Sequence, residues 1–108
     1  MNKRRTQARV AIATTMLATP DAQLWGYELS KNSRVGPGSM YPFLSELLEA
    51  GYLTDGWDTN RETGERTRRY YRLTDHGKAY LSSFVSAAPA ASRARAAATS
   101  ARPKLANP

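Results

Sequence analysis

The chain has 108 residues, no cysteine and a formal net charge of +7. This fits a single domain without disulfides or a thiolate metal site. No apolar run approaches the length of a membrane span and no secretory leader is recognisable, so we expect a cytoplasmic protein. A positive balance of this size favours an anionic partner, most often nucleic acid.

The positive charge is unevenly distributed along the chain. Residues 1–20 and 87–108 each carry four basic residues and no acidic one, whereas residues 21–86 sum to −1. We therefore divide the chain into a basic N-terminal arm (1–5), a folded domain (6–86) and an Ala/Arg-rich basic tail (87–108). The tail holds one large apolar side chain, Leu105. We expect it to be flexible, and to form a helix between Pro89 and Pro103 only where a partner holds it.

Two helices are predicted in the first third of the chain. Residues 6–18 place Ile12 and Met16 on one helical face, and this helix ends before Pro20. Residues 25–32 suit a short second helix with Trp25 and Leu29 directed inward. A weak strand pattern lies just before it, at residues 23–24.

A third helix follows the break SRVGPG. Its apolar side chains fall three and four residues apart, which is the pattern of an amphipathic helix: Met40, Phe43, Leu44, Leu47 and Leu48. If Ser39 is the N-cap, Pro42 lies in the first turn, where its missing N–H does no harm. Gly51 is expected to end the helix in the left-handed conformation.

The next segment predicts a β-hairpin and a fourth helix. Residues 52–58 and 68–74 are rich in aromatic and branched side chains, and Gly64 lies in the polar turn between them. On the second strand, Tyr71 and Leu73 are expected to face the core. Thr74 then caps a helix whose apolar stripe is Tyr80, Leu81, Phe84 and Val85.

This order of elements predicts an α+β, mostly helical winged helix-turn-helix: three helices, a two-stranded wing and a C-terminal helix. Arginines concentrate around the wing and are candidate phosphate contacts: Arg61, Arg66, Arg68, Arg69 and Arg72. Glu46 and Glu49 lie in the later half of the third helix, whereas a recognition helix presents its N-terminal half to base edges. That N-terminal half is uncharged.

Three stretches, GYELSKN, VGPGSMYPFLSELLEAGYL and RRYYRLTDHGKAYL, resemble the winged-helix core of PadR-type transcriptional regulators over residues 8–85, and the short subgroup in particular. The resemblance implies a third helix in the major groove, a wing on the DNA and a dimer built through the terminal helices. Carried over, the DNA-reading residues are Gly38, Ser39, Tyr41, Pro42 and Ser45. The dimer contacts are Ile12, Met16, Tyr80, Leu81 and Phe84. Some members bind phenolic or planar aromatic ligands between subunits, and whether an effector acts on this chain stays open.

We therefore expect a homodimeric, sequence-specific, nucleoid-associated repressor of an inverted-repeat operator in double-stranded DNA, with no cofactor or metal. One alternative is an architectural DNA-binding protein with little sequence choice. Another is a protein-interaction module that uses Glu46 and Glu49. Trp25 and Trp57 are expected to be structural, with an aromatic ligand pocket as the alternative. One histidine, His76, and scattered carboxylates suggest neither a metal site nor a nucleophile–base pair, so no enzyme is predicted.

Overall fold

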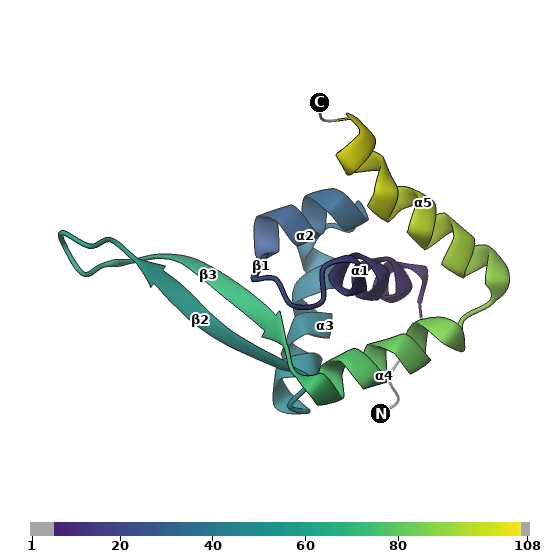
Figure 1. Ribbon diagram of the computed structural model, residues 1–108, viewed down its shortest axis with the longest axis horizontal. Helices are drawn as coiled ribbons and strands as arrows, with labels where there is room; N and C mark the ends of the chain where they lie inside the picture. Colours follow the sequence, from purple (N-terminus) through teal and green to yellow (C-terminus); the bar gives the residue numbers. More distant parts are fainter. Residues whose placement is uncertain (1–5, 107–108) are drawn as a thin grey trace.

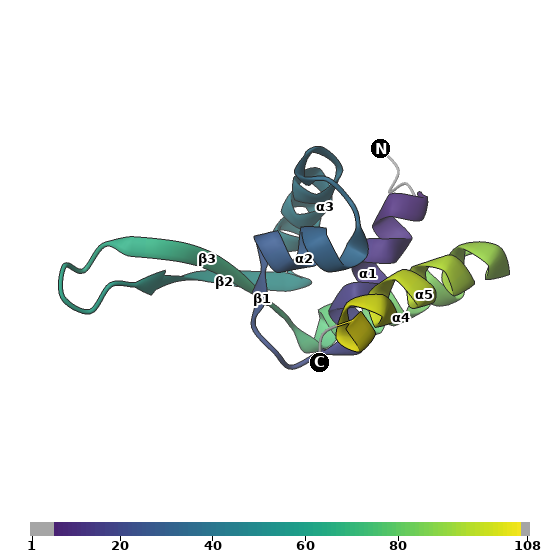
Figure 2. The same ribbon diagram turned by 90° about the horizontal axis from the view of Figure 1, so that it is seen from above.

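The computed structural model describes residues 6–106, which form five helices and a three-stranded antiparallel sheet. In chain order the elements are α1 (Gln7–Ala18), β1 (Leu24–Trp25), α2 (Gly26–Ser33), α3 (Pro37–Glu49), β2 (Leu53–Thr59), β3 (Arg66–Leu73), α4 (Asp75–Ser86) and α5 (Ala90–Ala106). The helices gather at one end, and β2 and β3 extend away from them as a wing (Figure 1). Seen from above, α3 lies on one side of the helical body, and α4 and α5 lie on the other (Figure 2). The predicted order of three helices, hairpin and helix is confirmed. The weak strand pattern at residues 23–24 corresponds to β1, which pairs with the wing, and α5 is an additional helix.

Helix α3 begins earlier than the sequence suggested. Gly36 is its N-cap, Pro37 is the first helical residue, and the Met40 amide donates to the Gly36 carbonyl. The fixed φ of proline suits this first position. The prediction that Ser39 caps the helix is therefore wrong, and Pro42 lies inside the helix. The lost hydrogen bond falls on the exposed side of α3, where water can satisfy the carbonyl that Pro42 leaves unpaired.

The end of α3 is a tight left-handed turn. Gly51 has a φ of 82°, as the sequence predicted, a conformation that disfavours any side chain with a Cβ. The amide of Gly51 donates to the Leu48 carbonyl and the amide of Tyr52 donates to the Leu47 carbonyl. This hydrogen-bond pair is the Schellman motif, and it turns the chain directly into β2.

Strand β3 is the centre of the sheet, with β1 and β2 on either side. Leu53 pairs with Leu73, and Leu24 pairs with Tyr71. As predicted, Tyr71 and Leu73 are buried, whereas Arg72 between them is exposed. One face of the sheet therefore closes the core, and the wing beyond it is largely exposed.

The core lies between α1, α3, α4 and the base of the sheet. Ile12, Met16 and Leu81 are fully buried there, and Phe84 is 4% exposed. The resemblance assigned these four residues to a dimer interface, but the structure places them inside the subunit's own core. Tyr80, the fifth, is half-buried, and its ring stacks on Tyr52 with centroids 4.2 Å apart. The dimer stays a prediction, and these four buried side chains offer no surface to it.

Helix α5 takes up most of the tail that was expected to be flexible over residues 87–108. The last two residues of that tail and the basic arm at residues 1–5 lie outside the described residues. It packs along α1 and reaches α2, in agreement with its position beside both helices in Figure 1. Ala96 is 1% exposed, Ala88 just before the helix is 4% exposed, and Gln7 donates from Nε2 to the Ser92 carbonyl at 3.4 Å. The prediction missed this helix because its contacts use small alanine side chains, which let two helices approach closely without a large apolar stripe.

Candidate nucleic-acid interface

The N-terminal half of α3 presents an exposed, uncharged surface. All five residues that were predicted to read DNA are exposed. Gly38, Pro42 and Ser45 lie opposite the core stripe of α3, and Ser39 and Tyr41 lie at the two edges of that exposed side. The structure therefore brings them together on one helix face. Such a surface can enter a groove without repelling phosphates.

The acidic residue nearest this surface is neutralised within the fold. Arg9 of α1 donates from Nη1 to Glu46 Oε1 at 2.8 Å and from Nη2 to Oε2 at 2.7 Å. The Arg9 guanidinium also lies 4.8 Å from the centroid of the Phe43 ring. The hydrogen bond to Glu46 raises the pKa of Arg9 above its ordinary value, against the opposing effect of partial burial. Glu46 is thus half of an ion pair between α1 and α3, whereas Glu49, which is also exposed, has no partner in the described ion pairs.

The wing arginines are exposed but differ in their partners. Arg69 donates from Nε and Nη2 to Asp55 Oδ2 at 2.9 and 2.6 Å, and this hydrogen bonding raises the pKa of Arg69. Arg68 stacks 4.0 Å from the Trp25 ring centroid and lies 3.7 Å from Glu28 Oε2. These two arginines have compensating carboxylates within the subunit.

The three other predicted phosphate contacts have no carboxylate partner in the described ion pairs. Arg61 lies in the loop between β2 and β3, at the tip of the wing. Arg66 lies 5.6 Å from the Trp57 ring centroid, and Arg72 donates to the Asp21 carbonyl at 3.5 Å. Their guanidinium groups are therefore not held by a carboxylate at ion-pair distance, although Glu62 and Glu65 lie in the same loop as Arg61.

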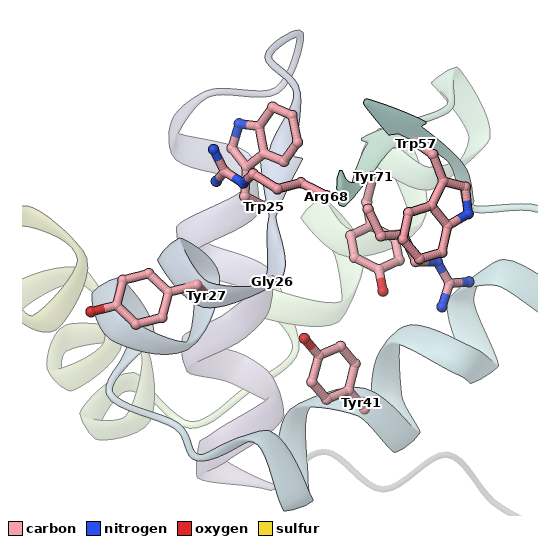
Figure 3. Close-up of a pocket in the computed structure, with 8 residues that line it drawn as sticks. Trp25, Gly26, Tyr27, Tyr41, Trp57, Arg68 and Tyr71 are labelled. Carbon is pink, nitrogen blue, oxygen red and sulfur yellow. The ribbon is translucent and has the colours of Figure 1, made fainter. Parts of the chain in front are cut away.

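Tyr41 does not extend freely from α3. The residue is 43% exposed, and its ring leans across to α2, so that its hydroxyl lies beside Gly26 (Figure 3). A Cβ on Gly26 would come within 2.4 Å of that hydroxyl oxygen. The absence of a side chain at Gly26 thus leaves the space in which Tyr41 lies.

Between α2, α3 and the wing is a cleft of about 370 Å³. Its lining is mostly aromatic, with two arginines: Trp25, Gly26, Tyr27, Tyr41, Trp57, Arg68, Arg69 and Tyr71. Burial raises the pKa of the Tyr71 hydroxyl, and the nearby Arg69 charge partly offsets that effect. We call this space the aromatic cleft.

Comparison with known proteins identifies the family. Residues 21–83 match the Transcriptional regulator PadR-like family. The chain belongs to this family. The crystal structure of smu.1704 from Streptococcus mutans UA159 has a similar fold, with a TM-score of 0.57, 27% identity, and coverage of 80% of this chain and 81% of that chain. No curated protein matches the chain.

The match to the PadR-like family spans α2, α3, the wing and most of α4, and leaves α1 and α5 outside. Members of the family are transcription regulators that bind DNA. Within residues 6–106 of this PadR-like chain, no cluster of histidine and carboxylate side chains could hold a metal ion, and no helix could span a membrane. The resemblance read from the sequence is confirmed.

Several residues of this PadR-like chain that border the exposed N-terminal half of α3 were not singled out from the sequence for DNA contact. Tyr27, 74% exposed, lines the aromatic cleft. Trp57 lines it too and is 44% exposed, although it was expected to be structural, with an aromatic ligand pocket as the alternative. Arg34, with a left-handed φ of 62°, ends α2, and together with Arg95 of α5 it lines a second cleft at the start of α3. Arg95 could not be placed there from sequence, because the docking of α5 had no visible pattern. Tyr27 could have been noticed, since it lies two residues before Leu29 and thus on a different face of α2.

Proposed function

We propose that this chain is a homodimeric, sequence-specific DNA-binding repressor of transcription. Helix α3 of each subunit enters the major groove, and the wing contacts the flanking backbone. A regulator of this kind acts where the chromosome is, which in a bacterial cell is the cytoplasm. Repression follows from competition with polymerase for the promoter.

One observation carries the proposal. The exposed N-terminal half of α3 is uncharged, and it lies next to a wing with five exposed arginines. An uncharged reading surface flanked by cations suits a ligand whose edges are polar and whose backbone is anionic. The order of elements and the family match support the same assignment.

The distribution of charge supports different roles in DNA binding for α3 and for the wing. Side chains such as Tyr41 and Ser45 contact base edges, and they supply the difference in affinity between one sequence and another. The unpaired arginines of the wing contact phosphates, together with Arg34 beside the start of α3. Each phosphate contact releases condensed counterions, so the affinity falls steeply as the salt concentration rises.

A two-fold dimer requires an inverted-repeat operator with half-sites about one helical turn apart. The dimer contacts would come from exposed parts of the terminal helices, because the interior of α1 and α4 is occupied by the subunit core. Light scattering coupled to gel filtration measures the molecular mass in solution and so tests for the dimer. The mass of a single subunit, together with binding to single half-sites, would contradict the dimer.

The decisive experiment is selection of bound duplexes from a random DNA pool, followed by gel-shift titration of the selected sequence against random duplex. We expect an inverted repeat to emerge, with at least about a thousandfold preference over random DNA. A ratio near one would favour the architectural alternative. Absence of duplex binding even at low salt would instead favour the protein-interaction module.

A further inference from the structure

Three large aromatic side chains remain exposed on the described part of the chain, and all three line the aromatic cleft. Tyr27 comes from α2, Tyr41 from α3 and Trp57 from β2. In Figure 3 the Tyr41 and Trp57 rings lie around the space between α3 and the wing, and the Tyr27 ring points outward from α2 at the edge of that space. Single exposed apolar residues are common on protein surfaces. A cluster of exposed apolar side chains on one cleft indicates a binding surface.

The charges at the cleft walls are compensated. Arg69 is hydrogen-bonded to Asp55, and Arg68 is stacked on Trp25 with Glu28 3.7 Å away. A phosphate placed inside the cleft would therefore compete with carboxylates that already hold these guanidinium groups. The cleft instead offers flat apolar faces, which suit an uncharged, partly apolar group.

The position of the cleft indicates what that group belongs to. The cleft separates the reading surface of α3 from the wing, and its rim carries Arg66 beside Trp57. Under the proposed function, α3 and the wing contact neighbouring parts of one duplex. A DNA strand that passes from one element to the other crosses this cleft. Its phosphates then lie near the rim, and its deoxyribose rings face the aromatic side chains.

We propose that the aromatic cleft receives the sugar rings of one DNA strand, and that Tyr27 and Trp57 are DNA-contacting residues. This inference rests on the proposed function and adds a component of binding that does not depend on cations. Apolar contacts between rings and deoxyribose release no condensed counterions. They contribute to affinity for every sequence without changing the dependence of affinity on salt.

The test compares Tyr27→Ala and Trp57→Ala with the matched variants Tyr27→Phe and Trp57→Phe, each titrated with the selected duplex at four salt concentrations. We expect each alanine variant to bind about five- to tenfold more weakly, since buried aromatic contacts dominate interface energetics. The slope of log affinity against log salt should equal that of the wild type. The phenylalanine variants, which keep a ring, should retain most of the affinity. All four substitutions replace exposed side chains, and unchanged thermal unfolding midpoints confirm that the fold is intact.

A second measurement follows the cleft directly. The chain has two tryptophans, so Trp25→Phe leaves Trp57 as the single fluorophore. Duplex DNA should protect Trp57 from acrylamide quenching if a strand covers the cleft.

Several results would overturn the inference. The first is an alanine variant that binds like the wild type. The second is a salt slope that falls by about one, the value for a lost phosphate contact. The third is acrylamide quenching of Trp57 that is the same with and without duplex DNA. If a planar small molecule then protects Trp57 from quenching, the cleft is assigned to that ligand instead. If the wild type binds no duplex at all, the proposed function fails and this inference fails with it.

Discussion

Arg9 of α1 and Glu46 of α3 form a two-pronged ion pair, with N–O distances of 2.8 and 2.7 Å. The Arg9 side chain is 14% exposed, because it also packs over the Phe43 ring, whereas Glu46 remains 45% exposed. The pair joins the first helix to the helix proposed to read DNA. It also explains how a basic DNA-binding protein can place a glutamate on that helix.

We predict that the ion pair between Arg9 and Glu46 contributes measurably to the free energy of unfolding. Arg9→Ala should lower the free energy of unfolding by about 1–2 kcal/mol, because it removes a charged hydrogen-bond pair and the contact with the Phe43 ring. A double-mutant cycle with Glu46→Ala should give a coupling of about 0.5–1 kcal/mol that decreases with added salt. Glu49→Ala, on the exposed part of the same helix, is the control. Equal effects of Arg9→Ala and Glu49→Ala in urea unfolding would contradict the prediction.

Gly26→Ala tests the position of Tyr41 without removing it. The new Cβ would lie 2.4 Å from the Tyr41 hydroxyl oxygen, and that oxygen is the far end of a side chain that can swing away. Because Gly26 is the first residue of α2 and not an interior one, the greater helix propensity of alanine adds little there, and the stability of the chain should stay about level. Affinity for the selected duplex should fall, by about tenfold if Tyr41 reads a base pair. A gel shift paired with thermal unfolding separates the two effects, and unchanged affinity would count against a role for the Tyr41 position in reading DNA.

Wing arginines should differ in their effect on salt dependence. Arg61→Ala and Arg66→Ala remove cations that have no carboxylate partner in the described ion pairs. Each should reduce the slope of log affinity against log salt by about 0.9 if its guanidinium contacts a phosphate. Arg69→Ala should change the slope less, because Asp55 already holds this guanidinium. Identical slope changes for all three variants would show that the Asp55 pair opens on DNA binding.

The sequence was sufficient to predict the elements that depend on local pattern. The apolar stripe of α3 predicted the buried Met40, Phe43 and Leu44, and the alternation on β3 predicted the buried Tyr71 and Leu73. Both are periodicities within one element, and burial follows from them directly. The family resemblance was carried by the same local stretches.

The features that the sequence did not reveal depend on which residue begins a helix, or on contacts between residues far apart in the chain. The sequence favoured Ser39 as the start of α3, whereas the fold begins the helix at Pro37 and leaves Pro42 on an exposed side. Arg9 and Glu46 are 37 positions apart, so no local pattern links them. Helix α5 docks through alanines such as Ala96, which look the same in a disordered tail and in a close helix contact.

Alkaline pH should destabilise the fold through Tyr71. Burial raises the pKa of its hydroxyl above the ordinary value near 10, so the folded chain keeps this proton at a pH where the unfolded chain has lost it. The stabilisation is complete below the unfolded pKa and is lost as pH rises from there through the folded pKa. The slope of stability against pH in that window approaches about 1.4 kcal/mol per pH unit for one proton. Tyr71→Phe should flatten this slope in urea unfolding at pH 9, 10 and 11, and an unchanged slope would assign the effect to another tyrosine.

The docking of α5 on α1 can be tested with two neighbouring alanines of α5, one buried and one exposed. Ala96 is 1% exposed, whereas Ala97 beside it is exposed. Ala96→Glu places a charged side chain in a closely packed contact and should release α5, since burying an unpaired carboxylate costs more than this small contact contributes. Trypsin should then cut rapidly after Arg93 and Arg95, while the fragment up to α4 keeps its tertiary structure. Ala97→Glu and the wild type should resist cleavage at these sites. Equal cleavage rates in all three proteins would mean that α5 is not held against α1 in solution.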